Sequence, residues 1–102
     1  MLPLAATYPL PETRPTACFA VHARAEPGVM PRVLELFSKR GLVPSSWHSS
    51  VGGPEDDELT IDVQVKGMEG ELTDYVAACL RQLPYVEVVL TSEKRVPAPA
   101  RG

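Results

Sequence analysis

The strictest pattern in this sequence is an alternation of apolar and polar residues between positions 59 and 66. Its apolar members are Leu59, Ile61, Val63 and Val65. Side chains on a β-strand point alternately to the two faces of a sheet, so a period of two indicates a strand with one buried face. Such a strand needs a second layer over its apolar side. The rest of the chain must supply further strands and that covering layer.

Two segments with helical spacing can form the covering layer. In the first, apolar residues recur at positions 30, 33, 34 and 37, after the turn signal Pro27-Gly28 and before the stop signal Arg40-Gly41. Pro31 is compatible with this helix because an N–H group in the first turn has no intrahelical acceptor. The second segment runs from Met68 to Leu83 and is stopped by Pro84.

Three further strands complete the pattern. Residues 16–23 alternate with apolar members at positions 17, 19, 21 and 23. The stretch from Val43 to Val51 is rich in serine and carries Pro44, which suits an edge strand, and Trp47 is its expected inward anchor. In the last strand the residues expected to point inward are Val86, Val88 and Leu90.

The resulting order is strand, helix, strand, strand, helix, strand. Right-handed crossovers then place both helices on one face of a four-stranded antiparallel sheet in the order 4-1-3-2. We therefore predict an α+β fold, the ferredoxin-like βαββαβ plait, over residues 16–92. A chain of 102 residues has room for one such domain. The proline-rich ends, residues 1–15 and 93–102, are expected to be flexible tails.

The charge balance argues against several classes of partner. A net charge of -3, from 10 Lys+Arg and 13 Asp+Glu, provides no basic field for nucleic acid or for an anionic membrane surface. The N-terminus lacks the basic start and the uninterrupted apolar stretch of a secretion signal. Cys18 and Cys79 form neither a metal-binding spacing nor a disulfide framework. We expect a cytoplasmic protein without a metal ion or a cofactor.

The residues on the sheet face turned away from the helices decide between several possible functions. The alternation assigns to it Cys18, Ala20, His22, His48, Thr60, Asp62, Gln64, Tyr85 and Glu87. Its central strands offer no aromatic ring on which RNA bases could stack. A row of His22, Asp62 and His48 is conceivable, but no nucleophile or further metal ligand accompanies it. No catalytic residue is therefore expected.

The turn Glu26-Pro27-Gly28 remains as a candidate site. Glycine lets the backbone approach a ligand closely, and the start of the following helix presents N–H groups that favour a carboxylate. The α-carboxylate of an amino acid would suit this position. A Pro-Gly pair that only turns the chain into a helix is equally consistent with the sequence.

Two blocks of the sequence resemble a known family. The stretch from Ala25 to Gly41, AEPGVMPRVLELFSKRG, is similar to the opening of ACT domains, above all those in the short small subunits of acetolactate (acetohydroxyacid) synthase. The stretch from Leu80 to Val89, LRQLPYVEVV, resembles the L-x-K-L-x-x-V-x-x-V ending of the same domains. The likeness covers residues 17–92.

The resemblance implies a non-catalytic regulatory subunit that stimulates a thiamine-diphosphate-dependent catalytic large subunit in branched-chain amino acid biosynthesis. ACT domains of that family pair into homodimers, and valine or a related effector binds at the interface. The positions carried over for the effector are Ala25, Glu26, Pro27, Gly28, Val29, Met30, Val43 and Pro44. The strand edge expected to pair in the dimer comprises Ser45, Ser46, Trp47, His48 and Ser49.

Two positions depart from the pattern of effector-sensitive members. Those members usually carry asparagine where this chain has Ala25 and Val43. Loss of such a polar partner costs on the order of 1–3 kcal/mol, which weakens binding by one or more powers of ten. The resemblance thus implies activation of a partner with weakened binding of valine. The alternative is a stand-alone ACT module that senses an amino acid or another small metabolite for another enzyme or regulator.

Overall fold

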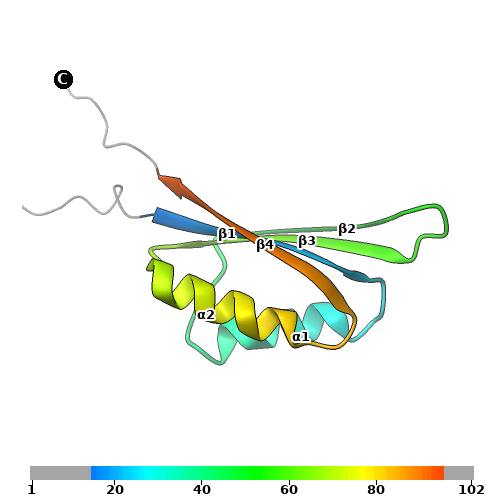
Figure 1. Ribbon diagram of the computed structural model, residues 1–102, viewed down its shortest axis with the longest axis horizontal. Coiled ribbons are helices and arrows are strands. Elements are labelled where there is room, and N and C mark those ends of the chain that lie inside the picture. Colours follow the sequence, from blue (N-terminus) through cyan, green and yellow to red (C-terminus); the bar gives the residue numbers. More distant parts are fainter. Residues whose placement is uncertain (1–14, 96–102) are drawn as a thin grey trace, which may run out of the picture.

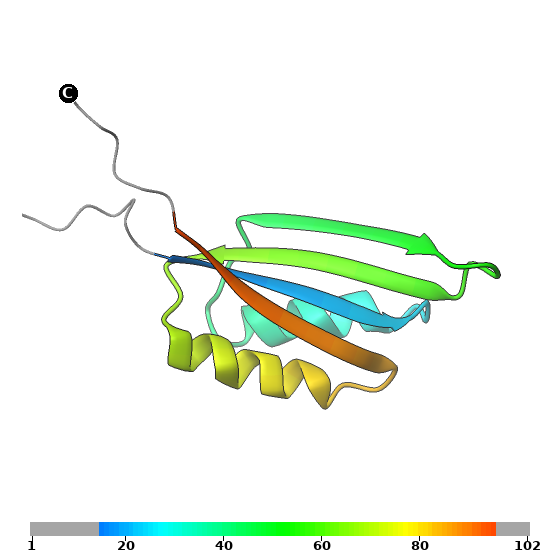
Figure 2. The same ribbon diagram turned by 45° about the horizontal axis from the view of Figure 1, so that its top comes forward.

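The computed structural model describes residues 15–95 and has the predicted architecture. Its elements are β1 (Pro15–Arg24), α1 (Val29–Ser38), β2 (Ser46–Gly52), β3 (Glu58–Lys66), α2 (Gly70–Arg81) and β4 (Val86–Arg95). The strands form one antiparallel sheet in the order β2-β3-β1-β4, which confirms the expected order 4-1-3-2 read from the other edge. Both helices cover the same face of the sheet, and the described chain leaves the other face uncovered (Figures 1 and 2).

The core lies between the covered face of the sheet and the two helices. Phe19 on β1 and Phe37 on α1 meet edge to face, with ring centroids 5.3 Å apart and ring planes inclined by 76°. The largest fully buried side chains come from both layers and are Phe19, Phe37, Ile61, Leu80, Val21, Val33, Val63 and Val76. The alternation in β1 and β3 therefore predicted the inward residues of both central strands correctly.

Arg40 joins the end of α1 to α2. Its guanidinium donates to the Leu36 carbonyl at 3.1 Å, to the Tyr75 hydroxyl at 3.2 Å and to the Cys79 Sγ at 3.7 Å. It also lies 5.1 Å from the centroid of the Tyr75 ring, within the range of a cation–π contact. The hydrogen bond to the Tyr75 hydroxyl raises the pKa of Arg40. Cys79 and Cys18 on the other side of the sheet are both free thiols.

The ends of β2 and β4 differ from the predictions. β2 begins at Ser46 rather than at Val43, so Val43 and Pro44 lie in the loop before the strand. Ser45 closes this loop, because its N–H and its Oγ both donate to the Gln64 carbonyl, at 2.7 and 3.2 Å. β4 continues to Arg95, beyond the expected end of the domain. Most of each expected tail, residues 1–14 and 96–102, lies outside the described residues.

The predicted inward residues of β4 are wrong beyond its first position. Val89 is 2% exposed and points into the core, whereas Val88 and Leu90 are 44% and 58% exposed. They pair with His22 and Ala20, whose side chains lie on the uncovered face. The uncovered face therefore carries an apolar pair on β4 that was expected to point into the core.

A β-bulge causes this difference. Val88 pairs with His22, but Val86 pairs with Ala23, so Glu87 is an extra residue between the two pairs. A shift of one residue moves every following side chain to the opposite face of the sheet. Val86 stays partly buried against the core, and the apolar residues beyond the bulge change sides.

Tyr85, just before β4, has the left-handed backbone conformation, with φ of 71°. This conformation costs a residue with a side chain about 1–2 kcal/mol, more than the ~0.5–1 kcal/mol of entropy that glycine costs. We expect Tyr85→Gly to raise the free energy of unfolding by roughly 0.5–1 kcal/mol, measured by urea denaturation. Glu87→Gly, at a residue without positive φ, is the control and should lower stability. A loss of stability in Tyr85→Gly would contradict the strain.

Candidate functional site

The turn between β1 and α1 is tied to two neighbouring segments of backbone. The Arg24 N–H donates to the Tyr85 carbonyl at 2.9 Å, next to the start of β4. The Ala25 N–H donates to the Asp57 carbonyl at 2.9 Å, next to the start of β3. Within the turn, the Glu26 N–H donates to the Arg24 carbonyl at 2.8 Å. The sequence-predicted turn is therefore a fixed corner of the fold.

The start of α1 leaves few backbone donors for a ligand. Gly28 caps the helix with φ of -82° and ψ of -5°, a conformation open to any residue. The Val29 N–H already donates to the Glu26 carbonyl at 3.1 Å, and Pro31 has no N–H group. Within the described chain, the N–H groups of Gly28 and Met30 remain without a backbone acceptor. An anion at this corner would meet these two donors and the positive end of the helix dipole.

Arg32 adds a positive charge to the same corner. Its Nη1 atom lies 2.6 Å from the place that a Cβ atom on Gly28 would occupy. A side chain at position 28 would therefore have to displace the flexible end of Arg32, whereas the φ of Gly28 is open to any residue. No ion pair of Arg32 is found among residues 15–95. Arg32 is not among the site residues predicted from the sequence, although a spacing of four residues on a helix places it directly above Gly28.

Val43 and Pro44 lie far from the other predicted site residues of the same chain. α1 spans 10 residues between them and the corner, which corresponds to about 15 Å of helix. Figure 1 shows the β1–α1 and α1–β2 connections at opposite ends of that helix. Val43 is 80% exposed. One chain thus brings together Ala25 to Met30 and leaves the rest of the predicted site apart.

The edge of the sheet at β2 has unpaired backbone groups. Ala25 and Asp57 bond through their backbones, and in an antiparallel ladder such hydrogen-bonded pairs recur at every second residue. By the register, residues 58, 60, 62 and 64 of β3 then bond to residues 52, 50, 48 and 46 of β2. The N–H and C=O groups of Trp47, Ser49 and Val51 therefore point outward from the sheet.

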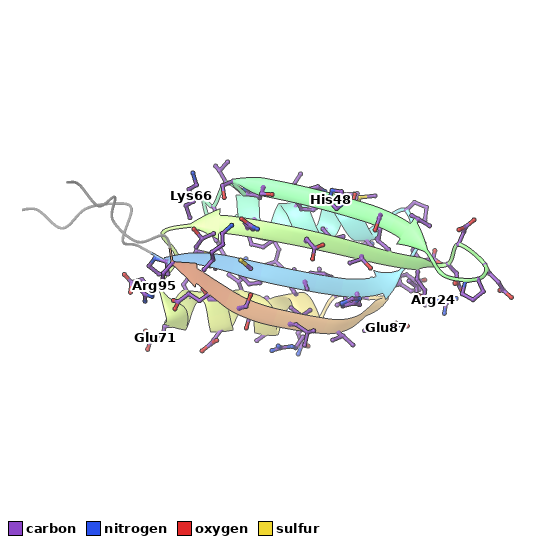
Figure 3. All side chains as sticks on the ribbon, turned by 90° about the horizontal axis from the view of Figure 1, so that it is seen from above. Arg24, His48, Lys66, Glu71, Glu87 and Arg95 are labelled. Atoms are coloured by element: carbon purple, nitrogen blue, oxygen red, sulfur yellow. The ribbon has the colours of Figure 1, made fainter. Side chains whose placement is uncertain are left out.

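Exposed apolar side chains accompany this open edge. Viewed from the uncovered face, α1 lies behind β2 and β3, and α2 lies behind β4 (Figure 3). Met30 and Leu34, one turn apart on α1, are 39% and 47% exposed, and Val51 on β2 is 54% exposed. Trp47 is only partly buried against the core. An unpaired strand beside apolar side chains is typical of an association surface.

The opposite edge of the sheet is protected. In the same ladder, the even-numbered residues of β4 bond to β1, so the Val89 carbonyl points to the free edge. Arg81 on α2 donates from its guanidinium to this carbonyl at 2.7 Å. A long charged side chain over the backbone of an edge strand hinders pairing with another strand. Of the two edges, β2 is therefore the one available for pairing.

The conceivable row of His22, Asp62 and His48 on the uncovered face is not a continuous cluster. His48 is the register neighbour of Asp62, whereas His22 lies opposite Thr60, so the three residues of the conceivable row are adjacent only in part. Among residues 15–95, no group of three or more His, Cys, Asp and Glu side chains could hold a metal ion. In the same residues, no helix is both long and apolar enough to cross a membrane.

Comparison with known proteins agrees with this fold. Curated proteins include no significant sequence match to the chain. The C-terminal domain of the MgtC protein from Mycobacterium tuberculosis has a TM-score of 0.65 at 17% identity, over 87% of this chain and 97% of that one. The ACT domain of GTP pyrophosphokinase from Chlorobium tepidum has a TM-score of 0.64 at 13% identity, over 76% and 96%. The regulatory subunit of aspartate kinase from Thermus thermophilus has a TM-score of 0.60 at 14% identity, over 78% and 51%.

The sequence itself matches a family profile. The profile of the ACT-like domain aligns with residues 12–96, which include every described strand and helix. At the low identities above, the solved structures support the fold, and the family profile adds the evidence of sequence. The chain belongs to the ACT-like domain family.

Proposed function

We propose that this chain is a non-catalytic regulatory subunit that works as a homodimer joined through its β2 edges. Antiparallel pairing centred on Ser49 gives the outward backbone groups of β2 partners in the second copy. It also sets Trp47 of one copy beside Val51 of the other, because both lie two residues from Ser49. The half-exposed apolar side chains of this edge are then covered.

The same pairing completes an effector site. Antiparallel pairing places the start of β2 in one copy beside the end of β2 in the other. The end of β2 lies at the same end of the sheet as the β1–α1 corner. Val43 and Pro44 of one copy thus face the corner of the other. The observation that carries the proposal is that the predicted site is split between the two ends of α1 in a chain whose β2 edge is open.

The chemistry of the corner favours a small carboxylate with an apolar side chain. The Gly28 and Met30 N–H groups and the Arg32 guanidinium suit the carboxylate. Val43 supplies apolar surface from the second copy. Ala25 and Val43 supply no side-chain acceptor for the α-ammonium group where effector-sensitive members carry asparagine, so valine should bind weakly.

The catalytic partner is proposed on the strength of the sequence resemblance. The similarity of residues 25–41 and 80–89 to small subunits of acetolactate synthase supports a thiamine-diphosphate-dependent large subunit, acting in branched-chain amino acid biosynthesis in the cytoplasm. The chain would act on that enzyme by contact, since no catalytic group of its own converges at the corner.

Mixing the chain with the large subunit of acetolactate synthase tests this proposal. We expect the rate of acetolactate formation to rise at least about twofold, a change in barrier of roughly 0.4 kcal/mol. Valine, leucine and isoleucine should then inhibit only at high concentration. An unchanged rate on mixing, at subunit concentrations where the chain is dimeric, would exclude this enzyme as the partner.

Gly28→Asp tests the corner itself. The new carboxylate would meet the Arg32 guanidinium and occupy the place of the ligand's carboxylate. We expect the response to an effector, followed by calorimetric titration, to weaken at least about tenfold while the assembly persists. Gly70→Asp is the matched control, because this glycine starts α2 with open space around it, and its effector response should be unchanged. Equal effects of the two substitutions would contradict the assignment.

A stand-alone sensor is the second candidate. The fold is similar to the ACT domain of a GTP pyrophosphokinase, a protein of another kind, and Ala25 and Val43 depart from the effector-sensitive small subunits. This function predicts no effect on acetolactate synthase together with a rise in melting temperature on adding a small carboxylate, since a ligand that binds the folded state stabilises it.

A further inference from the structure

The uncovered face of the sheet has an apolar half and a polar half. Val88 and Leu90 on β4 are 44% and 58% exposed, and Ala20 and His22 of β1 are their half-buried register partners. The β2–β3 half carries His48 and Asp62 instead (Figure 3). The bulge in β4 created this apolar strip, which no element of the described chain covers.

Charge divides the same face along the strands. Lys66 and Lys94 are both register partners of Thr16, at the end where β1 begins. At the other end Glu58 is the register partner of Arg24, and Glu87 lines a hollow together with His22 and Val88, so that end carries a net negative charge (Figure 3). None of these two lysines and two glutamates forms an ion pair within residues 15–95.

We propose that a second copy of this chain packs against the uncovered face, with its strands running opposite to those of the first. A two-fold axis across the strands brings the lysine end of each copy to the glutamate end of the other. A two-fold axis along the strands would set lysine against lysine, which like-charge repulsion disfavours. The chosen axis keeps β4 over β4 and β3 over β3, so that Leu90 meets Leu90 of the second copy. Lys66 and Glu58 each lie four rows from Ala20, in opposite directions, so Lys66 of one copy meets Glu58 of the other.

The register places this axis level with the β2 pairing. Ser49, the middle residue of β2, shares a row with Ile61, Val21 and Val89. Leu90 and Ala20 form the adjacent row. The two-fold axis of the face contact and the two-fold axis of the β2 pairing therefore lie within about one residue of each other along the strands. Two perpendicular two-fold axes that meet generate a closed tetramer. The closure rests on the β2 pairing proposed above, whereas the face contact stands without it.

The polar half of the face fits at the periphery of this contact. Two twisted sheets pack face to face at an angle of about 30° and diverge away from the line of closest approach. A contact centred on β1 and β4 thus leaves His48 and Asp62 near solvent. It buries the apolar strip without burying an unpaired carboxylate.

Sedimentation velocity and light scattering measure the assembly. We expect the unaltered chain to have the mass of four chains and Leu90→Glu to have the mass of two. Leu72→Glu is the control, because Leu72 on α2 is also partly exposed, at 37%, and lies outside both surfaces, so its mass should stay at four chains. A Leu90→Glu assembly of unchanged mass would overturn the proposal. A two-chain assembly of the unaltered protein that Leu90→Glu reduces to single chains would support the face contact and contradict the β2 pairing.

Charge exchange identifies the orientation. Lys66→Glu alone and Glu58→Lys alone each set like charges together, and each should raise the dissociation constant of the face contact at least about tenfold. An equal mixture of the two variants should associate again, because the new carboxylate at position 66 of one chain then faces the new ammonium group at position 58 of the other. Circular dichroism should show both variants folded, since these side chains are exposed. Failure of the mixture to associate would overturn the antiparallel packing while leaving the β2 pairing and the effector site untouched.

Discussion

Phe37→Ala is expected to lower the free energy of unfolding by about 3–5 kcal/mol, the cost of removing a buried phenylalanine. Phe37 is fully buried and packs edge to face on Phe19, with centroids 5.3 Å apart. The substitution removes this contact and leaves a cavity between α1 and the sheet. A domain of this size has a total stability of about 5–15 kcal/mol, so the variant should approach the limit of folding.

Urea denaturation followed by far-ultraviolet circular dichroism measures the loss, at one protein concentration because association adds to stability. Phe37→Leu keeps most of the volume and should cost less than about 1.5 kcal/mol. Leu72→Ala on α2, at a side chain that is 37% exposed, should have a smaller effect than Phe37→Ala. A loss below about 1 kcal/mol in Phe37→Ala would show that the aromatic pair is not the centre of the core.

Ser49→Pro is expected to halve the number of chains in the assembly. The Ser49 N–H points out of the sheet, so proline at this position removes a donor only from the pairing between copies. The β2–β3 ladder keeps its own hydrogen bonds. Because the proposed effector site combines the corner of one copy with Val43 of the other, the effector response should disappear as well.

Trp47 reports this change directly. It is the single tryptophan, it is partly buried, and it lies two residues from Ser49 on the pairing edge. Dissociation should expose the indole and move its emission to longer wavelength. Ser50→Pro is the matched control, since the Ser50 N–H points toward β3 and its loss should cost about 1–3 kcal/mol of folding stability. An assembly of unchanged size in Ser49→Pro would contradict pairing through β2.

Much of the fold could be predicted because its signals are local. The alternation in residues 59–66 assigned the faces of β3, and the same period assigned the faces of β1, as Phe19 and Val21 show by their burial. Pro84 and the apolar spacing before it located α2. β4 gave no such signal, because Val86, Val88, Val89 and Leu90 are apolar on both sides of the alternation. Only the bulge decided which of them faces the core.

The candidate site was predicted in part. The corner at Glu26 to Gly28 is visible in the sequence because Pro-Gly before a helical period is a turn signal. Arg32 was missed because its place above Gly28 depends on the first turn of α1. The separation of Val43 from the corner follows from the path of α1 across the sheet.

The sequence by itself determined the order of the elements, the inward faces of β1 and β3 and the corner after β1. These features depend on residues within a few positions of one another, where the periods of strand and helix act. The tertiary structure alone decided the exposure of Val88 and Leu90, the open edge at β2 and the edge of β4 guarded by Arg81. The physical reason is that hydrogen-bond register and edge protection arise between residues distant in sequence, where a slip of one residue exchanges the two faces of a strand.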